Sequence, residues 1–316
     1  MKLGVYIHGS SPFNPKVTFD EYSQLAIFYE NAGVETLWFA DHLIRTPDPN
    51  ESPLFETWSL IAGLSTITET IKFGTMVSPV TFRNIGLFAK MISTIDHMSN
   101  GRIIVGLGSG WYEKEHEMFD LQYPDLKTRS KLLEDSIEAL IQLWTSPNKV
   151  NFQSDSFTLK NAYLNPKPIQ KPHPPILIGG GGEKITLLQV AKYAQMSNFS
   201  GNIETIKHKL TVLKNHCSNI GRNYDEIIPT INMAAVIGKN QGEVEIGVEQ
   251  YRDRFLQLGM TPPSLSGFAD NRLVGTPEQI GEQIDKLKII GVKEINITIN
   301  DKTSEKYLPE VIKLYS

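Results

Sequence analysis

The chain has 316 residues, 40% of them hydrophobic and 21% charged, which is typical of a folded globular protein and excludes a disordered one. Its formal net charge of −4 provides no basic footprint for nucleic acid, and its apolar runs are too short to span a membrane. The N-terminus lacks the features of a signal peptide and Cys217 is the single cysteine, so we expect a cytoplasmic protein without a disulfide or a cysteine-built metal site.

Short β-rich runs alternate with amphipathic runs along the chain. The expected strands are Leu3–Ile7, Thr36–Ala40, Ile71–Val77, Ile103–Leu107, Pro175–Ile178, Met196–Phe199, Ile227–Val236 and Glu294–Ile299. The expected helices are Phe19–Ala32, Leu54–Thr68, Ile85–His97, Thr128–Trp144, Glu183–Tyr193, Ile203–Ile220, Glu243–Leu258 and Pro277–Ile290. This alternation predicts βαβ units and a parallel sheet, which suggests an α/β fold of the (β/α)8 TIM-barrel class. An open doubly wound sheet is the alternative, since a count of strands does not prove closure.

Two gaps between expected strands are longer than the others. Ser146–Pro175 follows strand four and is rich in Pro, Asn and Lys, whereas Gly259–Gly275 follows strand seven and contains Pro262 and Pro263. The βα rhythm resumes after each gap, so we expect surface insertions rather than linkers between domains. The chain is then a single barrel domain over residues 1–316.

Two helix starts carry strong local signals. Thr18 is followed three residues later by Glu21, the spacing of a capping box. Thr276, Pro277 and Gln279 combine a cap, a proline at the first helical position and a second capping box. These residues predict where the first and the last expected helices begin.

Candidate catalytic residues follow the carboxyl ends of the strands, where βα barrels place their active sites. His42 follows strand two, where an imidazole either transfers a proton near neutral pH or only hydrogen-bonds a ligand or a loop. Asp41 beside it is either a structural acceptor or a ligand contact. His8 follows strand one, but nothing in the sequence orients it. We take His42 as the candidate catalytic residue.

Four consecutive glycines, Gly179–Gly182, follow strand five and precede the helix expected from Glu183. Consecutive glycine N–H groups can converge on an anion, and the positive end of the helix dipole adds to the attraction. Lys184 adds a positive charge. The run lacks the Gly-Lys-Ser/Thr tail of a Walker loop, so it predicts a phosphate seat of another kind, with a ligand-free turn as the alternative.

The glycine-rich turn GLGSGW follows strand four. Its spacing and its place in the fourth βα unit differ from a dinucleotide fingerprint, which belongs in the first βα turn of its fold. We interpret Gly106 and Gly108 as packing positions inside the barrel. Ser109, Gly110 and Trp111 come last and are expected to contact a ligand.

A short acidic helix is expected directly after this turn, with Glu113, Glu115 and Glu117 around His116. Metal binding by this cluster is the alternative to a solvated face. We expect the solvated face, and no metal site in the chain.

Together these motifs resemble the luciferase-like monooxygenase superfamily and, within it, the branch that uses the deazaflavin coenzyme F420. The matching stretches are Trp38–His42, Gly74–Val77, Asp96–Arg102, Gly106–Tyr112, Asn165–Pro168, Pro174–Glu183 and His208–Ile227. They run in order through nearly the whole chain. Flavin and deazaflavin branches share the barrel, so the motifs identify the superfamily more sharply than the coenzyme.

The resemblance implies a tricyclic ring at the barrel mouth, with its phosphate near strands four and five. The Ser109–Trp111 end of the GLGSGW turn and the Gly179–Gly182 run would form the two walls of that phosphate seat. The resemblance also implies a non-proline cis peptide between Met76 and Val77, behind the ring. It further suggests a homodimer.

The resemblance places His42 near the carbon that exchanges a hydride. Related deazaflavin dehydrogenases carry a glutamate where Trp111 stands in this sequence. Glu113 is near, but it would have to turn inward to replace that acid. Trp111 therefore marks where the chemistry of this protein differs from that of those relatives.

Three functions are compatible with these features. The first is an F420-dependent oxidoreductase that transfers a hydride between the deazaflavin and a small organic substrate, with His42 moving the matching proton. The alternative is an FMN-dependent monooxygenase, in which reduced flavin activates oxygen. The second alternative is a non-catalytic barrel that binds a phosphorylated ligand.

Overall fold

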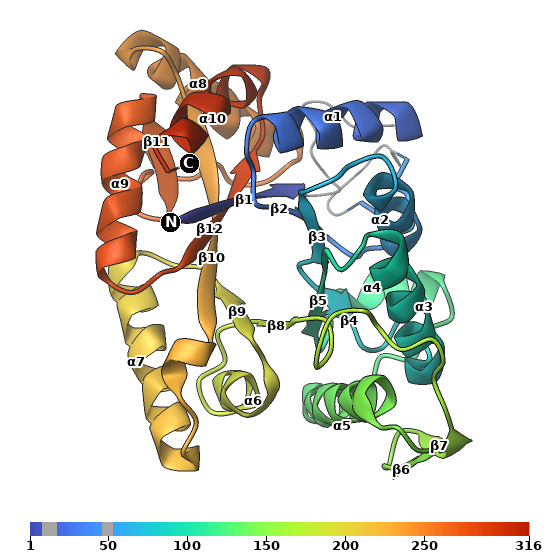
Figure 1. The fold of residues 1–316 in the computed structure, drawn as a ribbon. Helices are drawn as coiled ribbons and strands as arrows, with labels where there is room; N and C mark the ends of the chain where they lie inside the picture. Colours follow the sequence, from blue (N-terminus) through green and yellow to red (C-terminus); the bar gives the residue numbers. More distant parts are fainter. Residues whose placement is uncertain (8–17, 46–52, 316) are drawn as a thin grey trace.

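The chain folds into a closed parallel barrel, as a computed structural model that describes residues 1–7, 18–45 and 53–315 shows (Figure 1). Around the barrel the strands are β1 (Lys2–Ile7), β2 (Thr36–Phe39), β3 (Lys72–Thr75), β5 (Ile103–Gly108), β8 (Ile176–Gly179), β9 (Met196–Phe199), β10 (Ile228–Ile237) and β12 (Glu294–Ile299). Val5 on β1 pairs with Ile297 on β12 and so closes the ring. This closure confirms the predicted TIM barrel and excludes the open doubly wound sheet.

Helices surround the barrel on the outside (Figure 1). In chain order they are α1 (Phe19–Asn31), α2 (Thr57–Ser65), α3 (Ile85–Met98), α4 (Glu113–Met118), α5 (Leu126–Thr145), α6 (Thr186–Tyr193), α7 (Ile203–Ile220), α8 (Gln241–Gln257), α9 (Pro277–Ile289) and α10 (Lys302–Lys313). The capping boxes predicted at Thr18 and Thr276 are both formed, so these two helix starts are confirmed. Within the described residues, no helix is long and apolar enough to cross a membrane.

The two long gaps contain structure that the sequence pattern did not reveal. After barrel strand four, β6 (Val150–Gln153) and β7 (Thr158–Ala162) form an antiparallel hairpin. After strand seven, β11 (Arg272–Gly275) pairs with the end of β10 on the outside of the closed ring. Both segments are insertions, as predicted, but the first adds two short strands and the second adds one. Helix α10 after β12 lies outside the elements predicted from the sequence.

The barrel interior is filled by one large aromatic side chain with small neighbours around it. Trp38 is fully buried at its centre, and a Cβ atom on Gly74 would lie only 2.5 Å from the indole ring. Tyr6, Ile104 and Leu177 complete this inner cluster. The larger apolar core lies between the strands and the helices. A filled interior means that ligand-sized space exists only at the two ends of the barrel.

Strand three is interrupted before it reaches the mouth. The peptide between Met76 and Val77 is cis, as the family resemblance implied, and the chain then continues as β4 (Ser78–Pro79) beside β5. The Val77 side chain projects over neighbouring strands, where Cβ atoms on Gly108 and Gly179 would approach it to 2.6 and 2.7 Å. The predicted packing role of Gly108 is therefore confirmed, and Gly179 has the same role.

Candidate active site

A cavity of about 360 Å³ lies at the carboxyl ends of the barrel strands. It brings together most of the residues predicted from the sequence: His42, Met76, Val77, Ser109, Gly110, Trp111, Gly179 and Gly180. Sequence reasoning missed further lining residues, namely Tyr6, Pro79, Gly108, Glu115 and Asn198. Met76 and Val77 form one side of this cavity, with Val77 packed against the glycines of the neighbouring strands.

His42 is held by a buried carboxylate. Its Nδ1 atom lies 2.9 Å from Oε1 of Glu115, whose Oε2 accepts a hydrogen bond of 3.0 Å from the Leu43 backbone N–H. A carboxylate only accepts hydrogen bonds, so Nδ1 of His42 carries a proton and donates it to this contact. Nε2 is then the ring nitrogen available to the cavity, as a proton acceptor when the ring is neutral and a donor when it is charged.

Glu115 corrects the expectation of a solvated acidic helix. On α4, Glu115 and His116 are both 1% exposed, whereas Glu113 is exposed and does not turn inward. The His116 ring is held between two partners: Nδ1 donates to the Tyr112 carbonyl at 2.8 Å and Nε2 lies 2.7 Å from Thr81 Oγ1. Within the described part of the chain, no cluster of side chains could hold a metal ion.

Asp41 lies beneath the cavity and supports it. Its carboxylate accepts two hydrogen bonds from the Arg83 guanidinium, at 2.6 and 2.9 Å, and one of 2.5 Å from the Ser78 hydroxyl. Burial opposes the charge on Arg83, but pairing with Asp41 and Glu56 outweighs it, and the pKa of Arg83 is raised. Both carboxylate oxygens are thus engaged, which matches the structural interpretation of Asp41 rather than a direct ligand contact.

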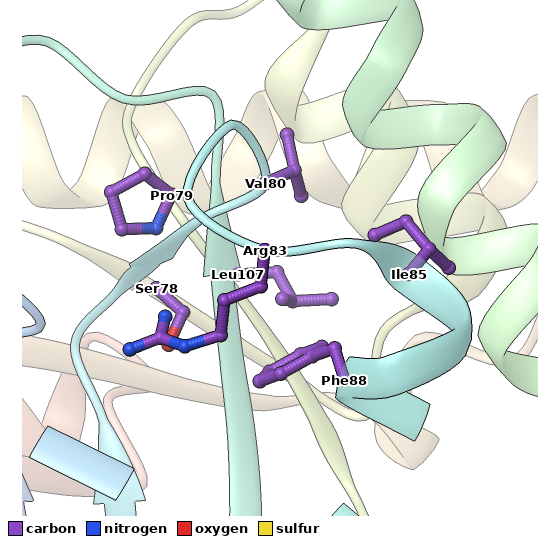
Figure 2. A pocket seen from close by; sticks show the side chains of 7 residues that line it. All are labelled: Ser78, Pro79, Val80, Arg83, Ile85, Phe88 and Leu107. Carbon is purple, nitrogen blue, oxygen red and sulfur yellow. The ribbon is translucent and has the colours of Figure 1, made fainter. Parts of the chain in front are cut away.

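Figure 2 shows how Arg83 reaches this position, with its side chain running past Ser78 and above Phe88 at the start of α3. The guanidinium carbon lies 5.9 Å from the centre of the Phe88 ring. The cavity enclosed here measures only about 10 Å³, room for a single water. It is a packing defect around the Arg83–Asp41 pair and too small for a ligand.

The four-glycine run divides into two parts. Gly179 makes room for Val77 at the end of β8, and the Gly180 N–H donates to the Asn198 carbonyl and so is not available to a ligand. Among the described residues, the N–H groups of Gly181 and Gly182 have no hydrogen-bond partner. These two groups, rather than all four, are available to an anion.

The surroundings of this loop also differ from the prediction. Helix α6 begins at Thr186 and not at Glu183, because the chain makes a turn over residues 183–185 first. Lys184 is exposed, whereas Lys209 from α7 lies beside Gly181 and pairs with Glu183 at 2.6 Å. The positive charge next to the glycine loop is therefore that of Lys209. His8, the weaker candidate at the mouth, lies outside the described residues.

A second cavity, of about 340 Å³, lies at the opposite end of the barrel. Glu294 lines it, is 2% exposed, and accepts one hydrogen bond of 3.2 Å from Trp38 Nε1. Burial raises the pKa of Glu294 to about 7. Lys2 and Lys72 at the same rim both pair with Glu35. These charged side chains therefore interact with one another and with solvent.

A barrel whose mouth combines a cis peptide floor, a glycine-lined wall and a carboxylate-held histidine is suited to an oxidoreductase that binds a flat coenzyme. The chain belongs to the luciferase-like monooxygenase family, whose pattern matches residues 1–294. This family contains both F420-dependent dehydrogenases and FMNH(2)-dependent monooxygenases.

Individual relatives represent both coenzyme classes. The chain is 31% identical over 196 residues to an F420-dependent glucose-6-phosphate dehydrogenase of Amycolatopsis mediterranei, a match that covers 61% of this chain and 54% of that protein. It is 28% identical over 266 residues to an FMNH(2)-dependent dimethylsulfone monooxygenase of Pseudomonas putida, covering 75% and 71%. The solved structure of an F420-dependent secondary alcohol dehydrogenase with an F420-acetone adduct superposes with a TM-score of 0.83 at 17% identity, covering 98% of each chain.

Proposed function

We propose that this protein is an F420-dependent oxidoreductase acting on a small organic substrate. The observation that carries the proposal is the His42–Glu115 pair, whose 2.9 Å contact leaves Nε2 of His42 available to the mouth cavity. A group fixed in this way is suited to move a proton, which is what the oxidation of an alcohol or the reduction of a carbonyl requires beside a hydride. The F420-dependent relative at 31% identity supports the choice of coenzyme.

The mouth fits a flat coenzyme with a phosphate. Gly108 and Gly179 lack a Cβ atom and so admit the Val77 side chain, which lines the cavity beside Met76 and suits the face of a tricyclic ring. The free N–H groups of Gly181 and Gly182, with Lys209 beside them, suit a phosphate. Bound F420 would supply the hydride chemistry.

The residues of this chain would then have separate tasks. Met76 and Val77 support the ring from behind, Ser109 and Gly110 border the phosphate, and Gly180 completes the wall between them. His42 holds or accepts the proton at Nε2, and Glu115 fixes the ring and stabilises its charged form through Nδ1. Asp41 acts through Arg83 and Ser78, which hold the turn after β4 under the cavity.

Coenzyme binding tests this proposal directly. Purified protein is titrated with F420 and, separately, with FMN under reducing conditions, and binding is followed by coenzyme fluorescence. Micromolar affinity for F420 and much weaker affinity for FMN are expected. The reverse order, with oxygen consumption in the presence of FMNH2, would replace the proposal with a monooxygenase, the function that the dimethylsulfone monooxygenase relative represents. Binding of neither coenzyme would favour a non-catalytic barrel.

A further inference from the structure

One aromatic side chain at the mouth is exposed although its backbone is fixed. Trp111 is 66% exposed, whereas the other three tryptophans, at 38, 58 and 144, are between 0 and 1% exposed. Because this ring lies at the edge of the cavity, it offers a ligand a large aromatic surface. Exposure alone does not distinguish a ring that binds a ligand from a mobile surface side chain. The contacts that fix the backbone around Trp111 decide between the two.

The backbone around Trp111 is held from three sides. The carbonyl groups of residues 110–112 accept hydrogen bonds of 2.6, 2.9 and 2.8 Å from side chains further along the chain, those of Arg129, Tyr123 and His116. Arg129 is itself 6% exposed and lies 3.8 Å above the Tyr123 ring, so the supports are fixed too. Three hydrogen bonds to consecutive carbonyl groups thus fix the backbone that carries this exposed side chain.

The Trp111 ring also lies next to the proposed proton-transfer residue. Its centre is 5.8 Å from that of the His42 imidazole, with the two rings nearly perpendicular at 83°. Both side chains line the same cavity. When a substrate stacks a flat group on the indole, the substrate atoms next to that group therefore lie within reach of His42.

The charges at the mouth limit the class of substrate that can stack a group on the indole. The described lining residues include Glu115 and His42 but no lysine or arginine. Beside Trp111, a phosphorylated or carboxylated substrate would meet the Glu115 carboxylate and, among the described lining residues, no lysine or arginine, which opposes its binding. This differs from what the name of the glucose-6-phosphate dehydrogenase relative says of its substrate.

We infer that Trp111 is the platform for an uncharged substrate, which stacks a flat aromatic or conjugated group on the indole and directs its alcohol or carbonyl toward His42. The inference rests on the proposed function for its reaction, and it adds the substrate class. The Ser109–Gly110 backbone serves the coenzyme, and the indole ring serves the substrate.

Probe binding tests the inference with and without F420. Benzyl alcohol is the expected ligand type, cyclohexylmethanol is a non-planar probe of similar size, and glucose 6-phosphate is the anionic one. Acrylamide quenching isolates Trp111, because the other three tryptophans are buried. Benzyl alcohol should shield the accessible fluorescence most strongly, cyclohexylmethanol less, and glucose 6-phosphate not at all. Trp111→Phe should remove the accessible component.

Ligand-observed NMR with benzyl alcohol supplies the variant comparison. Trp111→Phe should retain binding, and Trp111→Ala should weaken it about 10-fold. The control Tyr163→Ala, which removes an aromatic ring that is 74% exposed and does not line the cavity, should change nothing.

Several results would overturn the inference: equal shielding by glucose 6-phosphate, unchanged affinity in Trp111→Ala, or complete shielding of Trp111 by F420 alone. The proposed function fails separately, when neither F420 nor FMN binds. In that case shielding by benzyl alcohol in the coenzyme-free protein would still support an aromatic ligand at Trp111.

Discussion

The two ends of the barrel hold cavities of similar size, about 360 Å³ at the mouth and 340 Å³ at the base, and each contains a buried glutamate. At the mouth, both oxygens of Glu115 have N–H partners, from His42 and Leu43. At the base, Glu294 has one contact, with Trp38, and burial raises its pKa to about 7. The carboxyl group at the mouth therefore faces a neighbouring imidazole with both oxygens bonded, whereas burial at the base disfavours the charged form of Glu294.

This difference separates the chemistry of the protein from its stability. Changes to the His42–Glu115 pair should lower activity with small effects on folding. Changes at Glu294 should alter the dependence of folding on pH and leave activity nearly untouched. The predictions below test this division, from the largest expected effect to the smallest.

Replacement of His42 should have the largest effect. His42→Ala should lower kcat by about 10²- to 10⁴-fold, the usual contribution of a positioned proton-transfer group, while F420 affinity stays close to that of the wild type. Steady-state kinetics with a turned-over alcohol and a coenzyme titration measure the two quantities. The control is His97→Ala. His97 lies at the far end of α3, where its Nε2 atom contacts the Lys167 carbonyl, so this variant should retain full activity. Full turnover by His42→Ala would remove His42 from the mechanism.

Glu294 should control stability as a function of pH. Its pKa in the folded protein, about 7, lies above the ordinary value of 4.5, so the folded state holds a proton that the unfolded state releases in this range. The associated stability is complete below pH 4.5 and is lost as pH rises through 7, by an amount on the order of 3 kcal/mol. Glu294→Gln should therefore be more stable than the wild type at pH 8 and similar at pH 4.5.

Denaturant unfolding at several pH values measures this difference, with the exposed Glu282→Gln as a control that should follow the wild type. Activity of Glu294→Gln should stay within about twofold of the wild type, since the carboxyl lies at the end of the barrel away from His42. A wild-type stability that rises between pH 5 and 8 relative to Glu294→Gln would contradict the raised pKa.

Glu115 is the counterpart of Glu294 at the mouth. Glu115→Gln keeps the shape of the side chain but removes the charge that favours the imidazolium form of His42. A hydrogen bond to a charged group contributes about 1.5–3 kcal/mol, so kcat/KM should fall by roughly 10- to 100-fold. The pH–rate profile should also shift, which a purely structural role would not cause. An unchanged profile would assign Glu115 to the support of Leu43 alone.

Glu115 also shows where sequence reasoning reached its limit. The strands and long helices follow from local periodicity and caps, as at Thr18, and the cis peptide at Met76 follows from the family resemblance. Helix α4 has only six residues, too few to reveal which face is buried. Its orientation depends on contacts from distant residues such as His42 and Thr81, which no local pattern specifies.

The same limit applies to the other corrections. Asp41 was recognised at the mouth, but its partner Arg83 lies 42 residues further along the chain, and only folding brings them together. The start of α6 was placed three residues early because Ile185 at its cap provides no side-chain hydrogen bond and hence no sequence signal. The sequence was sufficient to predict the helices and strands, whereas it did not reveal which distant residues pair with the buried charges.

The smallest effects are expected from two buried hydroxyl groups, one at each end. The Thr36 hydroxyl lines the base cavity and, within the described residues, has no hydrogen-bond partner. Ser78 near the mouth donates to Asp41 and accepts from Trp58 Nε1 at 2.9 Å. Ser78→Ala should destabilise the protein by about 1–3 kcal/mol because it leaves Trp58 Nε1 without its partner and removes one hydrogen bond to Asp41. Thr36→Val should stabilise it by up to about 1 kcal/mol, since it removes a desolvated hydroxyl while keeping the shape.

Thermal unfolding at fixed pH compares the two substitutions. If Ser78→Ala lowers the stability and Thr36→Val raises it, the contrast between the two ends of the barrel extends to uncharged groups. Polar atoms are then paired under the mouth and unpaired at the base. Loss of stability in Thr36→Val as large as that in Ser78→Ala would show instead that the Thr36 hydroxyl bonds a water in the base cavity, because only a satisfied group costs that much to remove. The base would then be a hydrated polar site, and the suppression of charge at Glu294 would be a property of that residue alone.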